Sequence, residues 1–171
     1  DAHPKVVVKL IRKLSLSCGA AGMAGGQALD LESENKKLTK NEMDEIHQLK
    51  TGALISASVE MVGLLFTEFT DGQKLAFLHL ALKQYAKGFG MAFQIIDDVL
   101  DVIGTESEIG KPVGSDESNN KSTYPSIIGL EESKKEAINH SHYAVNILKE
   151  LPGGDSSYLK YLAEYLISRQ S

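Results

Sequence analysis

The chain has 171 residues and a formal net charge of −5 at pH 7, which is enough length to bury a core within one domain. The negative charge argues against nucleic-acid binding and against a basic membrane-binding patch, and no apolar run approaches the roughly 18 residues that a membrane span needs. The single cysteine, Cys18, cannot form a disulfide within the chain. It indicates a reducing compartment, and we expect a cytoplasmic location.

The first predicted helix covers residues 4–31. It begins at Pro4, because proline suits the first turn of a helix. Its second half, "GAAGMAGGQALDLE", is rich in glycine and alanine. So many small residues predict that a neighbouring backbone approaches this segment closely.

The second predicted helix covers residues 38–66 and starts with a capping box formed by Thr39 and Glu42. Apolar residues follow at helical spacing. Asp44 and His47 could form half of a two-metal site of the kind found in four-helix carboxylate proteins. We prefer to interpret them as an exposed pair early in the helix.

The third predicted helix covers residues 70–104. Thr70 or Asp71 opens it, and it ends near Gly104. The following segment, through about residue 124, is rich in Gly, Pro, Ser and Asn, which predicts a long loop. Shorter helices are predicted at 123–130, 131–150 and 156–169. No segment has the alternating pattern of a strand, so the predicted fold class is all-α.

Three carboxylates interrupt the apolar stretch "GFGMAFQIIDDVLDV" of the third helix. Asp97 and Asp101 share a face because they are four residues apart, and Asp98 lies beside them. No Lys or Arg occurs between Lys87 and Lys111 to neutralise them within the helix. Carboxylates left unpaired against apolar surroundings are costly. Oxygen ligands of this charge suit a hard cation such as Mg²⁺.

Other polar residues interrupt apolar or small-residue faces, or lie in the long loop. They are Gln27, Asp30, Lys50, Thr51, Gln94, Lys111, Asp116 and Lys121. If the helices are antiparallel neighbours, these residues can meet at one cavity. Metal-binding carboxylates near lysines would form a receptor for a diphosphate. Spacing alone equally allows a buried network of ion pairs with a purely structural role.

A resemblance favours the receptor. The motifs "GGQALDLE", "KTG", "FQIIDDVLD", "GK" at 110–111 and "NKSTYP" occur in this order. In order and spacing they are similar to the trans-prenyltransferase (polyprenyl synthetase) family, in particular to its bacterial farnesyl diphosphate synthases, or geranyltranstransferases. The resemblance runs from about residue 10 to Arg169. It implies an all-α isoprenoid-synthase bundle around a central cavity, and a homodimer.

Members of this family carry two aspartate-rich motifs, and the motif here resembles the second. We therefore expect residues 1–171 to be the C-terminal portion of a single prenyltransferase domain. The first motif and the isopentenyl diphosphate site would lie upstream of Asp1. On this expectation the chain alone makes no product.

The resemblance also implies a reaction and its metal. The reaction is the head-to-tail condensation of isopentenyl diphosphate with an allylic diphosphate, dimethylallyl or geranyl, to give farnesyl diphosphate. It begins with ionisation of the allylic C–O bond. Asp97 and Asp101 would bind Mg²⁺, or Mn²⁺ in its place, and Asp98 would act directly or through water. We expect the metal to bind only together with a diphosphate.

The resemblance assigns roles to the remaining residues as well. Lys50 and Lys111 would contact the allylic diphosphate, Thr51 and Gln94 would place oxygens near the carbocation, and Phe93 would pack near the isopentenyl group. Four further residues would position these groups without binding substrate themselves: Gln27, Asp30, Asp116 and Lys121. Asp30 would orient Lys50, and Asp116 would hold a metal-bound water.

Three alternatives remain open at this point. The chain could come from a longer-chain prenyl diphosphate synthase, such as a geranylgeranyl or polyprenyl diphosphate synthase. It could come from a terpene cyclase, which "KTG" together with the "GK" loop disfavours. It could also be a catalytically silent helical partner subunit, in which the aspartate motif would be expected to decay.

Overall fold

The computed structural model describes residues 3–65, 72–104, 121–151 and 155–168, and all the regular secondary structure in these ranges is helical. This confirms the predicted all-α class. The first half contains α1 (Pro4–Cys18), α2 (Met23–Glu32), α3 (Lys40–His47), the π-helix η1 (Gln48–Gly52) and α4 (Ala53–Leu65). The second half contains α5 (Gly72–Ile103), α8 (Tyr124–Ile128), α9 (Leu130–Lys149) and α10 (Ser157–Ser168).

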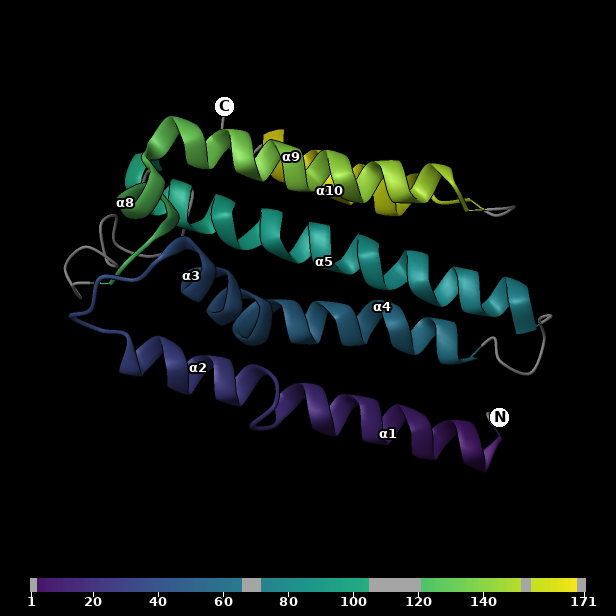
Figure 1. Ribbon diagram of the computed structural model, residues 1–171. Coiled ribbons are helices and arrows are strands. Elements are labelled where there is room, and N and C mark those ends of the chain that lie inside the picture. Colours follow the sequence, from purple (N-terminus) through teal and green to yellow (C-terminus); the bar gives the residue numbers. More distant parts are fainter. Residues whose placement is uncertain (1–2, 66–71, 105–120, 152–154, 169–171) are drawn as a thin grey trace.

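The helices form successive antiparallel layers (Figure 1). α1 and α2 make the first layer and pack on η1 and α4. The continuous unit α3–η1–α4 makes the second layer, and α5 the third. α9 and α10 pack together on the far side of α5. The three segments that carry the predicted site therefore come from adjacent layers.

The prediction of one helix over residues 4–31 is wrong in its middle. Residues 19–22 form a turn between α1 and α2, and Gly19 at the end of α1 is extended. A Cβ on Gly22 would lie only 2.2 Å from the carbonyl oxygen of Ser17. The turn therefore needs glycine at this position, and the sequence shows that only as general richness in small residues.

The second predicted helix begins where expected. The backbone N–H of Thr39 donates to Glu42 Oε2 at 2.8 Å, and the backbone N–H of Glu42 donates back to Thr39 Oγ1 at 3.4 Å. The helix is interrupted by η1, one π-helical turn over "QLKTG". Such turns are rare in helices and occur frequently at functional sites.

The later helices agree with their predicted ranges to within about two residues, the usual uncertainty of a helix end. Where the third predicted helix opens, at Thr70 or Asp71, lies outside the described residues. The same is true of most of the long loop after Gly104.

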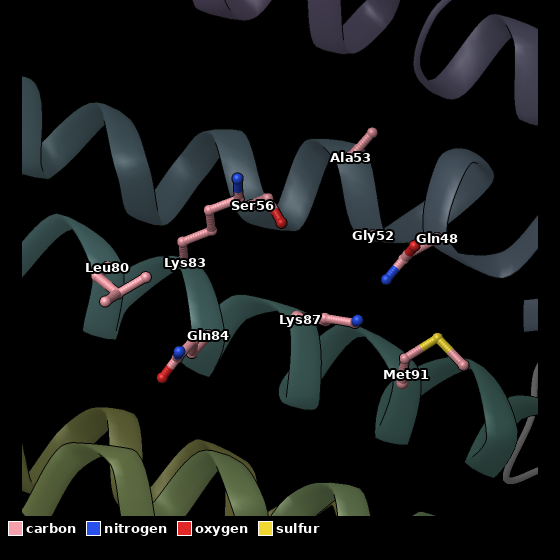
Figure 2. A pocket seen from close by; sticks show the side chains of 9 residues that line it. All are labelled: Gln48, Gly52, Ala53, Ser56, Leu80, Lys83, Gln84, Lys87 and Met91. Carbon is pink, nitrogen blue, oxygen red and sulfur yellow. The ribbon is translucent and has the colours of Figure 1, made fainter. Parts of the chain in front are cut away.

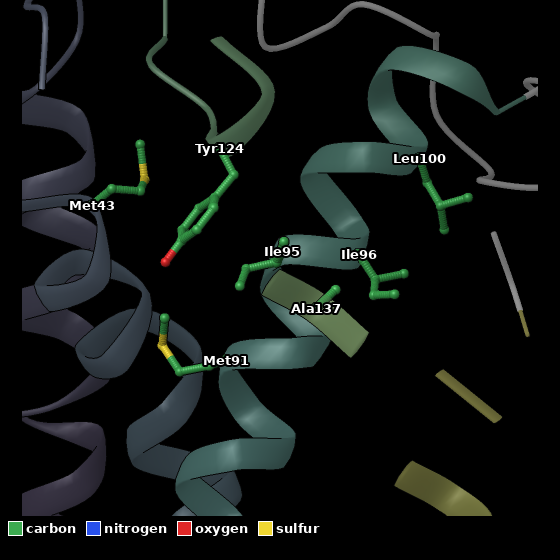
Figure 3. Packing of buried hydrophobic residues seen from close by; sticks show 7 residues of the cluster. All are labelled: Met43, Met91, Ile95, Ile96, Leu100, Tyr124 and Ala137. Atoms are coloured by element: carbon green, nitrogen blue, oxygen red, sulfur yellow. The ribbon is translucent and has the colours of Figure 1, made fainter. Parts of the chain in front are cut away.

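A hydrophobic cluster includes the residues of α5 that alternate with its aspartates. Its buried members are Met43, Met91, Ile95, Ile96, Leu100, Tyr124 and Ala137. In Figure 3 the Tyr124 ring stands between Met43 of α3 and Ile95 of α5, with its hydroxyl directed toward the α3 side. This cluster packs α3, α5 and α8 against one another, so it also constrains the α5 segment that carries the carboxylates.

The outer face of α1 is apolar and open. Val8 is 64% exposed, Ile11 60% and Leu14 46%, and these residues share one side of the helix. Large exposed apolar patches generally mark a surface that another structure covers. None of the described helices is both long and apolar enough to cross a membrane.

Candidate active site

A small polar cavity of about 110 Å³ lies where α2, α3, η1, α5 and the segment before α8 converge. The described residues that line it are Asp30, Met43, His47, Lys50, Gln94, Asp97, Asp98, Lys121, Ser122 and Thr123. Five of them, Asp30, Lys50, Asp97, Asp98 and Lys121, carry a formal charge at neutral pH. Residues from three separate parts of the sequence, which were predicted to meet, therefore lie around one space.

The three aspartates of α5 do not have equivalent positions. Asp97 is half-buried and lines the cavity. Asp98 also lines it but is only 5% exposed. Asp101 is 2% exposed and does not line the cavity among the described residues. Asp97 and Asp101 are thus buried to different degrees although they share a helical face. Their joint role as metal ligands stays a prediction.

Two hydrogen bonds hold Asp98, and a third group lies close to it. Its Oδ2 accepts a hydrogen bond from the backbone N–H of Tyr124 at 2.9 Å. Its Oδ1 accepts one from Gln94 Nε2 at 3.3 Å. His47 Nε2 lies 3.7 Å from Oδ2. The compensation that a buried carboxylate needs therefore comes in part from neighbouring elements rather than from basic residues of α5.

Asp30 bridges two lysines beside the cavity. Its Oδ2 accepts hydrogen bonds from Lys50 Nζ at 2.8 Å and from Lys121 Nζ at 2.7 Å. Burial alone would raise the pKa of Asp30, but the hydrogen bonds and charges of the two lysines outweigh it and hold the pKa below its usual value. Asp30 is therefore an anion at neutral pH, and it holds two cations at one side of the cavity.

Backbone geometry brings Lys50 to Asp30. A Cβ on Gly26 would lie 2.2 Å from the backbone nitrogen of Lys50, so α2 and η1 are in direct backbone contact. Asp30 is one turn after Gly26 on α2. The predicted close approach of a neighbouring backbone is thus confirmed, and it occurs at the π-helical turn that carries Lys50.

Thr51 and Gln94 form a pair beside the carboxylates. Thr51 Oγ1 donates to Gln94 Oε1 at 2.7 Å, and Gln94 in turn donates to Asp98. A chain of hydrogen bonds therefore connects η1 to the aspartate motif. Because the hydroxyl proton of Thr51 is used in this chain, the lone pairs of its oxygen remain available to other groups.

The other predicted site residues are less closely placed. Gln27 is exposed on α2 and does not line the cavity in the described part of the chain. Phe93 is half-buried and does not line the cavity in the described part of the chain. Lys121 lines it, as expected. Lys111 and Asp116 lie outside the described residues.

Sequence reasoning missed two side chains of this region. The expectation that His47 is exposed is wrong, since it is 5% exposed and its ring stacks on Tyr124 with centroids 5.6 Å apart. Burial lowers the pKa of His47 to about 4, although the charge of Asp44 opposes this shift. The Tyr124 hydroxyl donates to Asp44, and burial, followed by this hydrogen bond, raises its pKa. The one available signal was the spacing of His47 from Met43, which is four residues earlier and also buried.

The donor chemistry of the cavity fits a hard cation. Asp97 and Asp98 present carboxylate oxygens, and neither thiolate nor thiol lines the space among the described residues. Mg²⁺ prefers oxygen ligands and retains several waters. No group of three or more His, Cys, Asp or Glu residues within the described ranges is arranged to hold a metal by itself.

A larger groove of about 390 Å³ lies elsewhere, between η1–α4 and α5 (Figure 2). Lys83, Lys87 and Met91 line one side, and Gln48, Gly52 and Ser56 line the other. A Cβ on Gly90 would lie 3.3 Å from the Cα of Gly52, so the two helices pack closely near this point. The groove contains none of the aspartates and is distinct from the polar cavity.

Comparison with known proteins places the chain in a family. Residues 5–151 match the family model described as polyprenyl synthetase. The chain is 41% identical over 164 residues to the farnesyl diphosphate synthase of Escherichia coli (strain K12), covering 95% of this chain and 53% of that protein. It is 44% identical over 133 residues to the geranylgeranyl diphosphate synthase of Cyanophora paradoxa, covering 77% of this chain and 42% of that protein.

Solved structures agree with these sequence matches. The geranyltransferase of Helicobacter pylori, in a crystal structure complexed with magnesium and isoprenyl diphosphate, is 30% identical with a TM-score of 0.78. The match covers 97% of this chain and 52% of that one. The chain thus spans about half the length of the relatives it matches. Its helices have the all-α isoprenoid-synthase fold, and the chain belongs to the polyprenyl synthetase family.

Proposed function

We propose that the complete protein joins isopentenyl diphosphate head to tail to an allylic diphosphate, dimethylallyl or geranyl, and makes farnesyl diphosphate. The observation that carries this proposal is the polar cavity with Asp97 and Asp98 on α5 and the Asp30-held lysines Lys50 and Lys121 facing the same space. A diphosphate needs both a metal-binding surface and direct cationic contacts. Family membership with farnesyl diphosphate synthases supports this reading over a structural ion-pair network.

Lys50 is the residue we assign to the allylic diphosphate. Its Nζ is 2.8 Å from Asp30, and its side chain is 32% exposed, so it is oriented but still accessible. A pre-oriented cation loses little conformational freedom when the anion binds. Lys121 shares the same carboxylate and is more buried, with a side chain 17% exposed. We assign it to support of Asp30, and we assign Lys111 to the diphosphate on the family resemblance alone.

Thr51 and Gln94 act on the organic part of the substrate. When the allylic C–O bond ionises, the electron pair leaves with the diphosphate and positive charge develops on the allylic carbons. The double bond of isopentenyl diphosphate then attacks the allylic carbon, forming the new C–C bond, and a proton is lost. Thr51 donates its hydroxyl proton to Gln94, so the lone pairs of its oxygen can face this positive charge.

A divalent cation, Mg²⁺ or Mn²⁺, completes the site in this proposal. Asp97 would hold it directly, Asp98 directly or through water, and Asp101 from its buried position on the same helix face. When bound, the cation stabilises the negative charge of the departing diphosphate. The Helicobacter pylori relative crystallised with magnesium and isoprenyl diphosphate supports this assignment.

The chain length of the product distinguishes a farnesyl diphosphate synthase from the alternative, a geranylgeranyl diphosphate synthase. Matches to farnesyl diphosphate synthases cover 95% of the chain, which favours a farnesyl product. The geranylgeranyl diphosphate synthase match, at 44% identity, supports the longer-chain alternative. We also propose a homodimer, because the exposed apolar side chains of α1 suit a covered surface.

The test is a product assay on the complete protein with isopentenyl diphosphate, dimethylallyl diphosphate and Mg²⁺, and with the products separated by chain length. Farnesyl diphosphate is expected, and its formation should be strongly reduced in Lys50→Ala. The matched control is Lys83→Ala, which removes an exposed lysine of the groove in Figure 2. Absence of any prenyl product from the wild type would overturn the proposal, as would equal losses in both variants. A geranylgeranyl product would select the alternative.

A further inference from the structure

His47 is the least expected member of the polar cavity. It is 5% exposed, it lines the cavity, and its Nδ1 has no hydrogen-bond partner in the described part of the chain. Burying a polar ring nitrogen without a partner is costly. An apolar side chain of similar size would avoid that cost, and the contact of the other ring nitrogen, Nε2, indicates what the imidazole adds at this position.

The ring has one defined orientation relative to the aspartate motif. One face stacks on Tyr124, with an interplanar angle of 18°. Its Nε2 edge lies 3.7 Å from Asp98 Oδ2. The backbone of the same Tyr124 donates to that same oxygen at 2.9 Å. The His47 ring and the backbone N–H of Tyr124 therefore both approach the same carboxylate oxygen, Oδ2 of Asp98.

The two carboxylate oxygens of Asp98 therefore have different neighbours. Oδ2 faces His47 and the Tyr124 backbone, whereas Oδ1 faces Gln94 of its own helix. A carboxylate that serves a metal directly or through water gains affinity when neighbouring groups fix its orientation. The contacts to Oδ2 supply such a constraint from outside α5.

We infer that His47 is a positioning residue for Asp98. The Nε2 edge of His47 would fix the orientation of the Asp98 carboxylate, which would in turn bind the metal and its diphosphate directly or through water. This inference rests on the proposed function, because it requires that the cavity binds a metal and a diphosphate. It assigns His47 no contact with substrate. The proposal separates the role of Nε2 from the role of the ring as a packing element.

Three substitutions separate these roles. His47→Phe keeps an aromatic ring to stack on Tyr124 and removes the nitrogen edge. His47→Gln places an amide nitrogen near the position of Nε2. His47→Asn is also a polar amide, but its shorter side chain reaches only near the position of Nδ1. If His47→Phe does not fold, the comparison of Gln with Asn still decides the question.

The matched control is His79→Phe. His79 also has a buried ring nitrogen without a partner among the described residues, and it packs against Gly63, away from the cavity. Its replacement can change thermal stability, but it removes nothing from the site. It therefore shows how much of any effect comes from replacing a buried imidazole.

The measurement is calorimetric titration of Mg²⁺ into the complete protein with inorganic diphosphate present and absent, alongside thermal unfolding without either ligand. We expect His47→Phe and His47→Asn to weaken Mg²⁺ binding in the presence of diphosphate by about tenfold or more, the usual effect of losing a group that orients a metal ligand. His47→Gln should keep most of the affinity, and His79→Phe should keep all of it.

The inference is wrong if His47→Phe binds as the wild type does, or if Gln and Asn are equally impaired. A wild type that binds no Mg²⁺ with diphosphate would instead overturn the proposed function itself. Tight Mg²⁺ binding without diphosphate would contradict the expected dependence of the metal on the anion. These results are distinct, so failure of the inference cannot be mistaken for failure of the function.

Discussion

Gly26 and Lys50 are in backbone contact: a Cβ added to Gly26 would lie 2.2 Å from the Lys50 nitrogen and 2.7 Å from its Cα. The atoms that such a Cβ would meet belong to the backbone of Leu49 and Lys50 and cannot rotate away as a side chain can. The position of the Lys50 ammonium therefore depends on the absence of a side chain twenty-four residues earlier. This contact links the small-residue pattern of α2 directly to the proposed diphosphate site.

Gly26→Ala should push η1 away from α2 and move Lys50 from Asp30. We expect a loss of stability of about 1–3 kcal/mol, typical of overpacking, and a rise in KM for the allylic diphosphate. Chemical denaturation and steady-state kinetics on the complete protein measure the two effects. The control is Gly72→Ala, where an added Cβ meets nothing within 4 Å. Equal behaviour of the two variants would contradict the contact.

Asp30→Asn should destabilise the protein at neutral pH, because Lys50 and Lys121 lose the anion between them. The loss should be about 1.5–3 kcal/mol, the range for hydrogen bonds to charged groups. In the folded protein the two lysines hold the pKa of Asp30 below its ordinary value of 3.8. Its stabilising effect is therefore present above the unfolded pKa and is lost as pH falls through the folded pKa.

The measurement for Asp30 is urea denaturation of wild type and variant at pH 7 and at several values below 3.8. The difference in the free energy of unfolding should be largest at pH 7 and should shrink at the lowest values. A difference that stays constant with pH would mean that the carboxylate charge is not what holds the lysines.

Asp97→Ala should lower kcat by roughly 100-fold or more, since it removes stabilisation of charge on the departing diphosphate. Lys121→Ala should cost less, because Lys121 acts on the substrate only through Asp30. Steady-state kinetics of both variants at saturating Mg²⁺ provide the comparison. Equal losses of kcat would show that the division between metal ligand and supporting residue is wrong.

Residues 1–171 alone should make no prenyl diphosphate. Positioning of both substrates contributes about 7–11 kcal/mol to lowering such a barrier, and the chain spans about half of the relatives it matches. The exposed apolar face of α1 should also cause self-association. Incubation with both substrates and Mg²⁺, with light scattering on the same sample, tests this. Farnesyl or geranyl diphosphate from a monodisperse monomer would contradict it.

Much of the fold could be predicted from local patterns. Caps such as Thr39 and apolar spacing fix where helices start and which faces they bury, because both depend on neighbouring residues. The break at residues 19–22 was missed because glycine-rich sequence is compatible with either a helix or a turn. The π-helical turn at Gln48–Gly52 was also missed; it lies where the chain meets the backbone of α2 at Gly26, a contact that local residue spacing does not reveal.

The candidate site divides in the same way. Asp97, Asp98 and Lys50 were found because charge in an apolar helix is unusual and because they belong to family motifs. The Asp30 bridge to Lys50 was expected from the resemblance, but its second arm, to Lys121, requires contact across ninety-one positions. His47 was interpreted together with Asp44 as an exposed pair early in a helix, whereas the partners that bury it, Tyr124 and Asp98, are distant in sequence.

The most direct test of the central claim is a crystal structure of the complete protein with Mn²⁺ and a non-ionising allylic thiodiphosphate. Manganese is located by its anomalous scattering, which separates it from water. We predict a manganese peak beside Asp97, with the diphosphate between that metal and the ammonium of Lys50 while Asp30 still bridges Lys50 and Lys121. An ordered thiodiphosphate bound elsewhere, with no manganese in the polar cavity, would contradict the assignment of this cavity as the active site.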